Sequence, residues 1–198
     1  MSDLVLGSTT VLSDSSGTPT IQSGVVFPAG HVLETKQTLY RGSVGVANSD
    51  GYYQPSGFEV TTTAKVANVK FLINYAVSLG MDASADISLG SGIFKDSDSD
   101  PLSETINSGV KSSQTKTSMH SAAYWNLSGN SQYQMVPLGG QYLYTSTLAK
   151  DASITFKIKI RQGDASNQVI YVNRSGSDND ATWMTRSVSQ ISVQQIMP

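Results

Sequence analysis

From residue 31 onward, apolar and polar residues alternate along the chain with a period of two. The stretch SITFKIKIR at residues 153–161 is the clearest example, because every second residue from Ile154 to Ile160 is apolar and the residues between them carry hydroxyl or basic side chains. An α-helix would distribute those apolar side chains around its whole circumference. The pattern therefore predicts a β-strand with one face toward a core and the other toward solvent.

Residues 71–79 follow the same alternation, with an additional feature. Phe71, Ile73 and Tyr75 begin one apolar face, but Leu72 and Ala76 make the opposite face partly apolar as well. A strand that is apolar on both faces is usually covered on both. We therefore expect something to pack against the second face of this strand.

Similar short runs recur between loops rich in Gly, Ser, Asn and Asp, and no window carries a helical stripe of apolar residues. This spacing is typical of an all-β sandwich. In the last run, Val188 is out of phase with Ile191 and Val193, which predicts a β-bulge near residues 189–190. The further predicted strands are 31–39, 58–62, 87–94, 116–125, 133–137, 142–147, 168–172 and 187–196.

Residues 1–30 differ from the rest of the chain. Short apolar pieces are separated by Gly, Ser, Thr and Pro, and the segments GTPT at 17–20 and FPAG at 27–30 interrupt any regular structure. Such a segment buries little on its own. We interpret residues 1–30 as an extended anchoring arm that docks on another surface, and residues 31–198 as the β-sandwich domain; a terminus that docks on nothing is the alternative.

Composition narrows the range of partners. The 198 residues are only 14% charged with a net charge of −2, whereas roughly a quarter is usual. Lys and Arg are scattered and do not cluster with aromatic residues, so no nucleic-acid partner is expected. There are no cysteines, and no apolar run has the length of a membrane span or a signal-peptide core. We therefore expect neither a disulfide framework nor a membrane partner.

Catalytic residues are not evident. His31 and His120 each lie in a strand-like run, where a histidine is more often structural, and no nucleophile elbow is present. A carboxylate pair for glycoside hydrolysis depends on distances in space, and only Glu34 and Glu59 occupy plausible strand positions. The sequence therefore predicts a protein that is not an enzyme and that has no cofactor.

Alternating aspartates at Asp96–Asp100 are the best candidate for a metal site, because they can present oxygens to calcium. An EF-hand loop would then require Gly at position 101 and Glu at position 107, where this chain has Pro101 and Asn107. A solvated loop is the favoured interpretation, and the same holds for Asp178 and Asp180. No metal ligand is predicted, although cation binding at these aspartates stays open.

Aromatic residues offer a different kind of candidate site. Tyr52, Tyr53 and Trp125 lie near predicted strand ends or loops, where exposed aromatic rings often contact sugars or proteins. The competing interpretation, which we favour, is that half of each aromatic pair faces the core. The three residues are retained as possible surface contacts.

Residues 154–196 resemble a family of small virion structural proteins of tailed phages, including cyanophages. The resemblance rests on the alternating strand 154–161, on the segment VIYVNRSGSDND at 169–180 and on the closing strand RSVSQISVQQI at 186–196, where Gln195 stands at a position that is commonly acidic. A looser match covers 30–38. The resemblance implies a jelly-roll sandwich like that of tumour-necrosis-factor-type proteins, assembled as a homotrimer.

Together these observations predict a homotrimeric virion surface protein whose residues 1–30 bind another virion protein, such as the major capsid or a tail protein. Capsid decoration (cement) or a head-fibre knob is the first expected role, and a tail-fibre or tail-tip protein that binds host-surface carbohydrate is the alternative. A separate carbohydrate-binding module and a depolymerase are further alternatives. The depolymerase is disfavoured by the lack of acid clusters.

Overall fold

The computed structural model describes residues 4–6, 9–13, 20–21, 27–47, 51–81, 87–102, 120–125, 131–162, 169–178 and 186–198. Antiparallel β-strands dominate the regular structure of these residues, and a 3-10 turn, η1, lies at Ser131–Tyr133. The strands are β1 (Leu4–Leu6), β2 (Thr9–Ser13), β3 (Thr20–Ile21), β4 (Val32–Tyr40), β5 (Val44–Ala47), β6 (Glu59–Thr63), β7 (Lys70–Met81), β8 (Ile87–Lys95), β9 (Ser121–Trp125), β10 (Met135–Thr145), β11 (Ser153–Gln162), β12 (Val169–Val172) and β13 (Ser189–Ile196).

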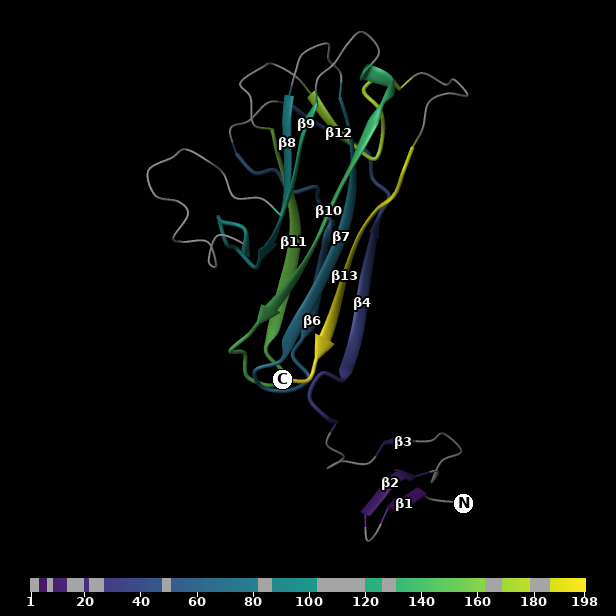
Figure 1. The fold of residues 1–198 in the computed structure, drawn as a ribbon, viewed down its shortest axis with the longest axis vertical. Helices are drawn as coiled ribbons and strands as arrows, with labels where there is room; N and C mark the ends of the chain where they lie inside the picture. The colour runs from purple at the N-terminus through teal and green to yellow at the C-terminus, as the bar shows by residue number, and fades with distance from the viewer. Residues whose placement is uncertain are drawn as a thin grey trace.

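Two antiparallel sheets form the body, and their long strands run along the long axis of the molecule (Figure 1). In one sheet β7 lies between β10 and β13, β4 pairs with β13, and β12 and β5 continue the sheet at the far end of β7. The other sheet has the order β6-β11-β8-β9. If β4–β5 and β12–β13 are each counted as one interrupted strand, the two sheets hold strands 1-8-3-6 and 2-7-4-5, which is the order of a jelly roll. The predicted all-β jelly-roll sandwich is confirmed.

The eighth strand is interrupted by an insertion. Both β12 and β13 run antiparallel to β7, and Val172 pairs with Leu79 while Gln190 pairs with Ala76. The chain therefore leaves the sheet after Val172 and re-enters it at Ser189, close to its point of departure. This insertion contains the polar residues NRSGSDND at 173–180.

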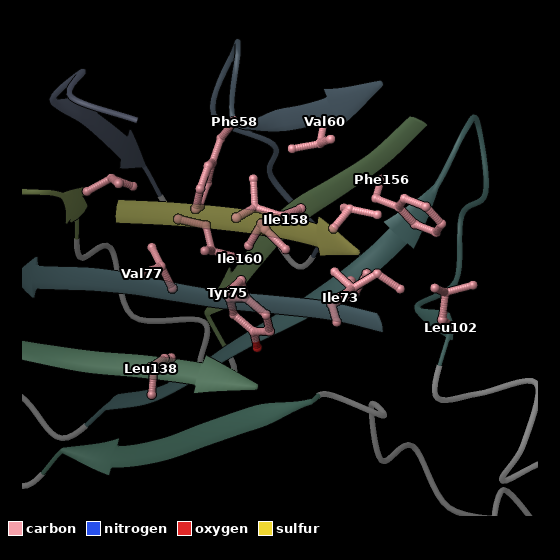
Figure 2. Packing of buried hydrophobic residues seen from close by; sticks show 14 of the residues in the cluster. Phe58, Val60, Ile73, Tyr75, Val77, Leu102, Leu138, Phe156, Ile158 and Ile160 are labelled. Atoms are coloured by element: carbon pink, nitrogen blue, oxygen red, sulfur yellow. The ribbon is translucent and has the colours of Figure 1, made fainter. Parts of the chain in front are cut away.

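The core lies between the two sheets (Figure 2). Alternate residues of β7 and β11 point into it, as the period-two pattern predicted, because successive side chains of a strand project to opposite faces. Full burial of each large apolar side chain stabilises the fold by about 1.5–3 kcal/mol relative to exposure. The core residues of these two strands include Phe71, Ile73, Val77, Leu79, Ile154, Phe156, Ile158 and Ile160.

Most predicted strands are confirmed, but β10 is one strand where the sequence predicted two. The interval between the two predicted strands, 138–141, contains the Gly139-Gly140 pair. A Cβ at Gly139 would lie 2.8 Å from the carbonyl oxygen of Tyr75, and one at Gly140 would lie 2.9 Å from the Tyr75 ring. The two glycines therefore mark a close approach to neighbouring atoms within a continuous strand. The sequence also missed β5, and residues 116–119 of the predicted 116–125 strand lie outside the described residues.

The predicted bulge near residues 189–190 is wrong. Residues Ser189 to Gln195 pair regularly with β4, and the register shift falls between Gln195 and Ile196. Val188 broke the alternation because it precedes the strand and is 49% exposed. The irregularity of the last strand therefore lies at its end.

Residues 4–21 contain a small antiparallel sheet, β1-β2-β3, which Figure 1 shows apart from the sandwich. Leu4 pairs with Leu12 next to a register shift between Leu4 and Val5, and Leu12 pairs with Ile21. The anchoring role predicted for residues 1–30 stays a prediction. No helix among the described residues is long and apolar enough to cross a membrane.

Candidate assembly surface

The outer face of the β4-β13-β7-β10 sheet carries no charged residue over three consecutive rows of paired positions. We call this surface the amide face. Its rows follow the strand pairing, so that Gln37, Ser192, Asn74 and Gln141 lie side by side in the middle row. The twelve positions are Thr35, Gln37, Leu39, Gln190, Ser192, Gln194, Leu72, Asn74, Ala76, Gly139, Gln141 and Leu143.

Neutral hydrogen bonds cross the amide face. Gln141 Nε2 donates to Asn74 Oδ1 at 2.6 Å, and Gln37 Nε2 donates to Gln190 Oε1 at 3.0 Å. Leu39 and Leu143 lie on the two flanking strands and are 47% and 51% exposed. The amide face therefore combines two kinds of side chain. Its amide and hydroxyl groups can both donate and accept hydrogen bonds, and aliphatic side chains lie exposed among them.

The opposite face of the sandwich has a different character. Lys157, Lys159 and Arg161 alternate with the buried residues of β11 and thus lie on the outer side of the β6 sheet, and Glu59 lies on the neighbouring strand. Phe94 of β8 also lies on this side: the ring of Tyr52, which precedes β6, meets it edge-on at 4.7 Å, and Lys159 Nζ lies 4.2 Å from its ring centre. Charge is therefore segregated between the two faces.

The two candidate tyrosines lie against the β6 sheet. Both rings are half-buried, and the Arg161 guanidinium lies 5.7 Å from the Tyr52 ring centre. The backbone of Tyr53 exchanges two 2.8 Å hydrogen bonds with Ile160, and its side chain lines a small cavity with Val46 and Ile170. Trp125 ends β9 opposite Ile87, but its side chain lies outside the described residues.

The Asp96–Asp100 loop uses its oxygens within the protein. Asp96 has a φ of 45°, and its Oδ1 accepts the Thr155 N–H at 2.9 Å. Asp98 Oδ2 lies 3.3 Å from Lys95 Nζ, and the Asp98 carbonyl accepts Lys159 Nζ at 3.0 Å. In the described part of the chain, no three His, Cys, Asp or Glu side chains gather at a distance suited to a metal ion. The aspartates therefore connect the β8 loop to β11.

Asp178 is neutralised by arginines. Its oxygens accept Arg186 Nη2 at 2.7 and 2.9 Å and lie 3.6 Å from Arg174 Nη1. Arg174 also stacks on Tyr171, with 3.7 Å between the guanidinium carbon and the ring centre. Asp180 lies outside the described residues. The segment that follows Asn173 is thus held by ion pairs and ring stacking.

The two histidines have separate structural roles. His31 stacks on Phe27 with 4.4 Å between ring centres. His120 Nδ1 accepts the Ile93 N–H at 3.1 Å, and its ring meets Tyr142 edge-on at 5.3 Å. Burial of the ring lowers the pKa of His120 to about 4. Glu34 and Glu59, the predicted carboxylate candidates, lie on β4 and β6 and bond to different partners, Thr62 and Gln54 respectively.

Sequence reasoning did not identify the amide face. A signal was present in the last strand, where Gln190, Ser192 and Gln194 alternate with buried residues and none is charged. The corresponding signal in β4 is the alternation of Thr35, Gln37 and Leu39. Only the pairing of strands distant in sequence assembles these positions into one surface.

No model of a known protein family matches the sequence, and no curated protein matches it. Among solved structures, the chain is similar to the infectious bursal disease virus Gx strain structure, with 8% identity over 83% of this chain and 37% of that chain at a TM-score of 0.35. It is also similar to the CBM22-1 xylan-binding domain of Paenibacillus barcinonensis Xyn10C, with 12% identity over 87% of this chain and 99% of that one at a TM-score of 0.29. The chain thus spans about a third of the viral protein.

Proposed function

We propose that this chain is a structural protein of a phage virion, a homotrimeric surface component anchored by residues 1–30. The observation that carries the proposal is the charge-free amide face on a jelly-roll sandwich whose other face is charged. The resemblance of residues 154–196 to tailed-phage virion proteins supports a phage virion as the particle to which this protein belongs. The first role is capsid decoration or a head-fibre knob.

The amide face suits packing against other copies of the chain. Burial of a charged group without a partner is costly, and the amide face has no charge among its twelve positions. Neighbouring copies that pack through this face bring together amides that both donate and accept, whereas copies packed through the β11 face would bring together Lys157, Lys159 and Arg161 of like sign. Assembly through the amide face leaves the charged faces in solvent.

The arm connects the sandwich to the particle. Its three short strands hold only ten residues in total, and so small a sheet needs another surface to be stable. Backbone pairing places Leu4 opposite Leu12 and Leu12 opposite Ile21. A capsid or tail protein is the partner that we propose for this sheet.

The alternative role is a tail fibre or tail-tip protein that binds host-surface glycan. Its candidate contacts were Tyr52, Tyr53 and Trp125, and the two tyrosine rings are half-buried against the sandwich. This placement favours the first role, because flat sugar-binding aromatics present an open ring face. A glycan array that detects saturable binding, abolished by Tyr52→Ala, would favour the alternative.

The test of the anchoring role is particle loading. Virions lacking the protein are incubated with the full chain or with residues 31–198, and bound protein is quantified after sedimentation. We expect the full chain to load onto the particles. Residues 31–198 should lose at least about 90% of that loading, because the contacts between the arm and the particle are removed. Electron microscopy of gold-labelled protein then assigns it to the capsid or the tail.

Equal loading of both proteins contradicts anchoring by the arm. A scrambled arm of the same composition is the matched control, because it retains length and charge. Loading by the scrambled arm also contradicts the proposal.

A further inference from the structure

Three side chains from three strands converge at the end of the sandwich where β13 finishes. Glu34 lies on β4, Thr62 on β6 and Gln195 on β13, and Gln195 is paired directly with Glu34 across the sheet. Thr62 and Gln195 are each only 1% exposed. Because β6 belongs to the other sheet, this cluster joins the two layers.

The hydroxyl of Thr62 is oriented as a nucleophile with a base. Thr62 Oγ1 donates to Glu34 Oε2 at 2.8 Å, and the same hydroxyl oxygen accepts Gln195 Nε2 at 2.7 Å. A carboxylate within hydrogen-bond reach of a hydroxyl can remove its proton as the oxygen attacks. The electrophilic carbon of the Gln195 carboxamide is therefore adjacent to an oxygen whose proton already points to a base.

The carboxamide of Gln195 is itself held for attack. The Lys65 backbone N–H donates to Gln195 Oε1 at 2.9 Å, where negative charge would develop. Gln195 Nε2 donates to Glu34 Oε2 at 2.8 Å, so the same carboxylate can return a proton to the departing nitrogen. Nucleophile, base, oxyanion donor and leaving group are all present within one cluster, in which Thr62 and Gln195 are buried and the Glu34 side chain is 22% exposed and lies 3.0 Å from Lys65 Nζ.

We propose that Thr62 and Gln195 form an intramolecular ester. Thr62 Oγ1 attacks Gln195 Cδ, the Oγ1–Cδ bond forms, the Cδ–Nε2 bond breaks, and ammonia leaves. The hydroxyl proton passes to Glu34 and from Glu34 to the departing nitrogen, so Glu34 is regenerated. No oxidant, reductant or second substrate is consumed.

Distance and environment favour this reaction. The Cδ–Nε2 amide bond is about 1.33 Å long, so Oγ1 lies at most about 4 Å from Cδ, and it has to move from the edge of the carboxamide, where Nε2 donates to it, to the face of Cδ before it attacks. Burial by itself raises the pKa of Glu34, but hydrogen bonds from Lys65 and Thr62 outweigh it, and the net pKa is lowered. Glu34 is therefore ionised and able to act as a base at neutral pH.

The product would lock the fold. The bond connects positions 133 residues apart and attaches the closing strand β13 to β6 of the opposite sheet. β13 also pairs with β4, the strand that follows the arm. A covalent link at this point keeps the sheets joined when load is applied through residues 1–30, although the chemistry does not depend on the proposed virion role.

Intact-mass measurement of the purified full chain tests the proposal. Ester formation releases ammonia, so the expected mass is about 17 Da below that of the sequence. Peptide sequencing should place the loss on a linked pair of peptides containing Thr62 and Gln195. Treatment with hydroxylamine should cleave that link, because it is an ester.

Variants separate the proposed roles. Thr62→Val removes the nucleophile while retaining shape, and Glu34→Gln removes the base while retaining hydrogen-bonding ability, so both should show the full sequence mass. Thr62→Ser keeps a hydroxyl and should restore the loss. Thr61→Val is the matched control, since its hydroxyl pairs with Thr155 and faces no carboxamide; it should lose about 17 Da like the parent.

Two results would overturn the proposal. One is a folded parent protein that retains its full sequence mass after prolonged incubation at neutral pH. The other is a loss of about 17 Da that maps to another position or persists in Thr62→Val, since the Thr62 hydroxyl is then not the nucleophile. Circular dichroism of each variant confirms that the mass is measured on folded protein.

Discussion

Asn173 holds the point where the eighth strand is interrupted. It has a φ of 63°, and its Nδ2 donates to the carbonyls of Tyr40 and Gly42 at 2.7 and 3.0 Å. Its Oδ1 accepts the Ser189 hydroxyl at 2.5 Å, which brings the two ends of the insertion together. One side chain thus fixes the break between β4 and β5 and the break between β12 and β13.

Asn173→Ala should destabilise the protein by about 4 kcal/mol, because three hydrogen bonds are lost and alanine is placed at a positive φ. Three hydrogen bonds contribute about 1 kcal/mol each, and alanine tolerates a left-handed backbone less well than asparagine. Urea unfolding measures the change. Asn68→Ala is the matched control, because Asn68 also has a positive φ, 56°, but is exposed; it should cost about 1 kcal/mol. Equal losses would show that the Asn173 side-chain bonds contribute nothing.

His120 should make stability depend on pH in the acid range. Its folded pKa, about 4, lies below the ordinary value of 6.5 because the ring is buried. The unfolded chain therefore binds the extra proton between pH 6.5 and 4, and the free energy of unfolding should fall as pH decreases through that window. A pKa shift of one unit corresponds to about 1.4 kcal/mol in the free energy of unfolding. Because the ring is partly exposed, we expect the whole loss between pH 6.5 and 4 to be about 2 kcal/mol.

Urea unfolding of the parent and of His120→Gln at several pH values measures this effect. Glutamine can accept the Ile93 N–H and does not titrate, so the variant should lose less stability than the parent between pH 6.5 and 4. The carboxylates of both proteins titrate alike and cancel in the difference. Parallel stability curves would contradict the assignment.

Gln195 illustrates what a single position in the sequence could not reveal. It stands where the resembling family commonly has an acidic residue, and sequence reasoning recorded it only as a departure. In the structure its Nε2 lies within hydrogen-bond distance of three acceptors, Glu34, Thr62 and the Thr63 carbonyl, which share its two N–H donors. A carboxylate could not donate these bonds and would oppose the charge of Glu34. The departure therefore has a local physical reason.

At the scale of elements, regular alternation was sufficient where one strand face is buried and the other is solvated. β11 and β7 were predicted nearly to their ends for that reason. β5 was missed because its four residues, Val44–Ala47, are too few to show a period. β10 was predicted as two strands separated by an interval that contains Gly139 and Gly140, whereas these glycines lie within one strand and closely approach Tyr75, more than sixty positions away.

The bulge prediction failed for a related reason. Alternation alone cannot distinguish an extra residue within a strand from a residue that precedes it. Pairing with β4 and β7 shows that Val188 precedes β13. The insertion between β12 and β13 likewise depends on contacts with Tyr40 and Ser78, which no local pattern encodes.

At the scale of the whole molecule, the central feature is the segregation of charge between the two faces. The sequence predicted low charge and a second covered face on residues 71–79, and both expectations point to the surface on which Leu72 and Ala76 lie. It could not predict that Gln37, Ser192, Asn74 and Gln141 form one row, because four distant strands contribute them. The candidate tyrosines, Tyr52 and Tyr53, by comparison, pack on the other sheet.

The mass of the full chain in solution, measured by light scattering, tests the central claim most directly. The account predicts a particle of three times the 21.1 kDa chain mass, and it predicts that Gln141→Lys, which places like charges in the amide face, shifts the protein to monomer. Thr63→Lys on the opposite sheet should leave the trimer intact. A parent protein that is monomeric at micromolar concentration, or a trimer unaffected by Gln141→Lys, would contradict assembly through the amide face.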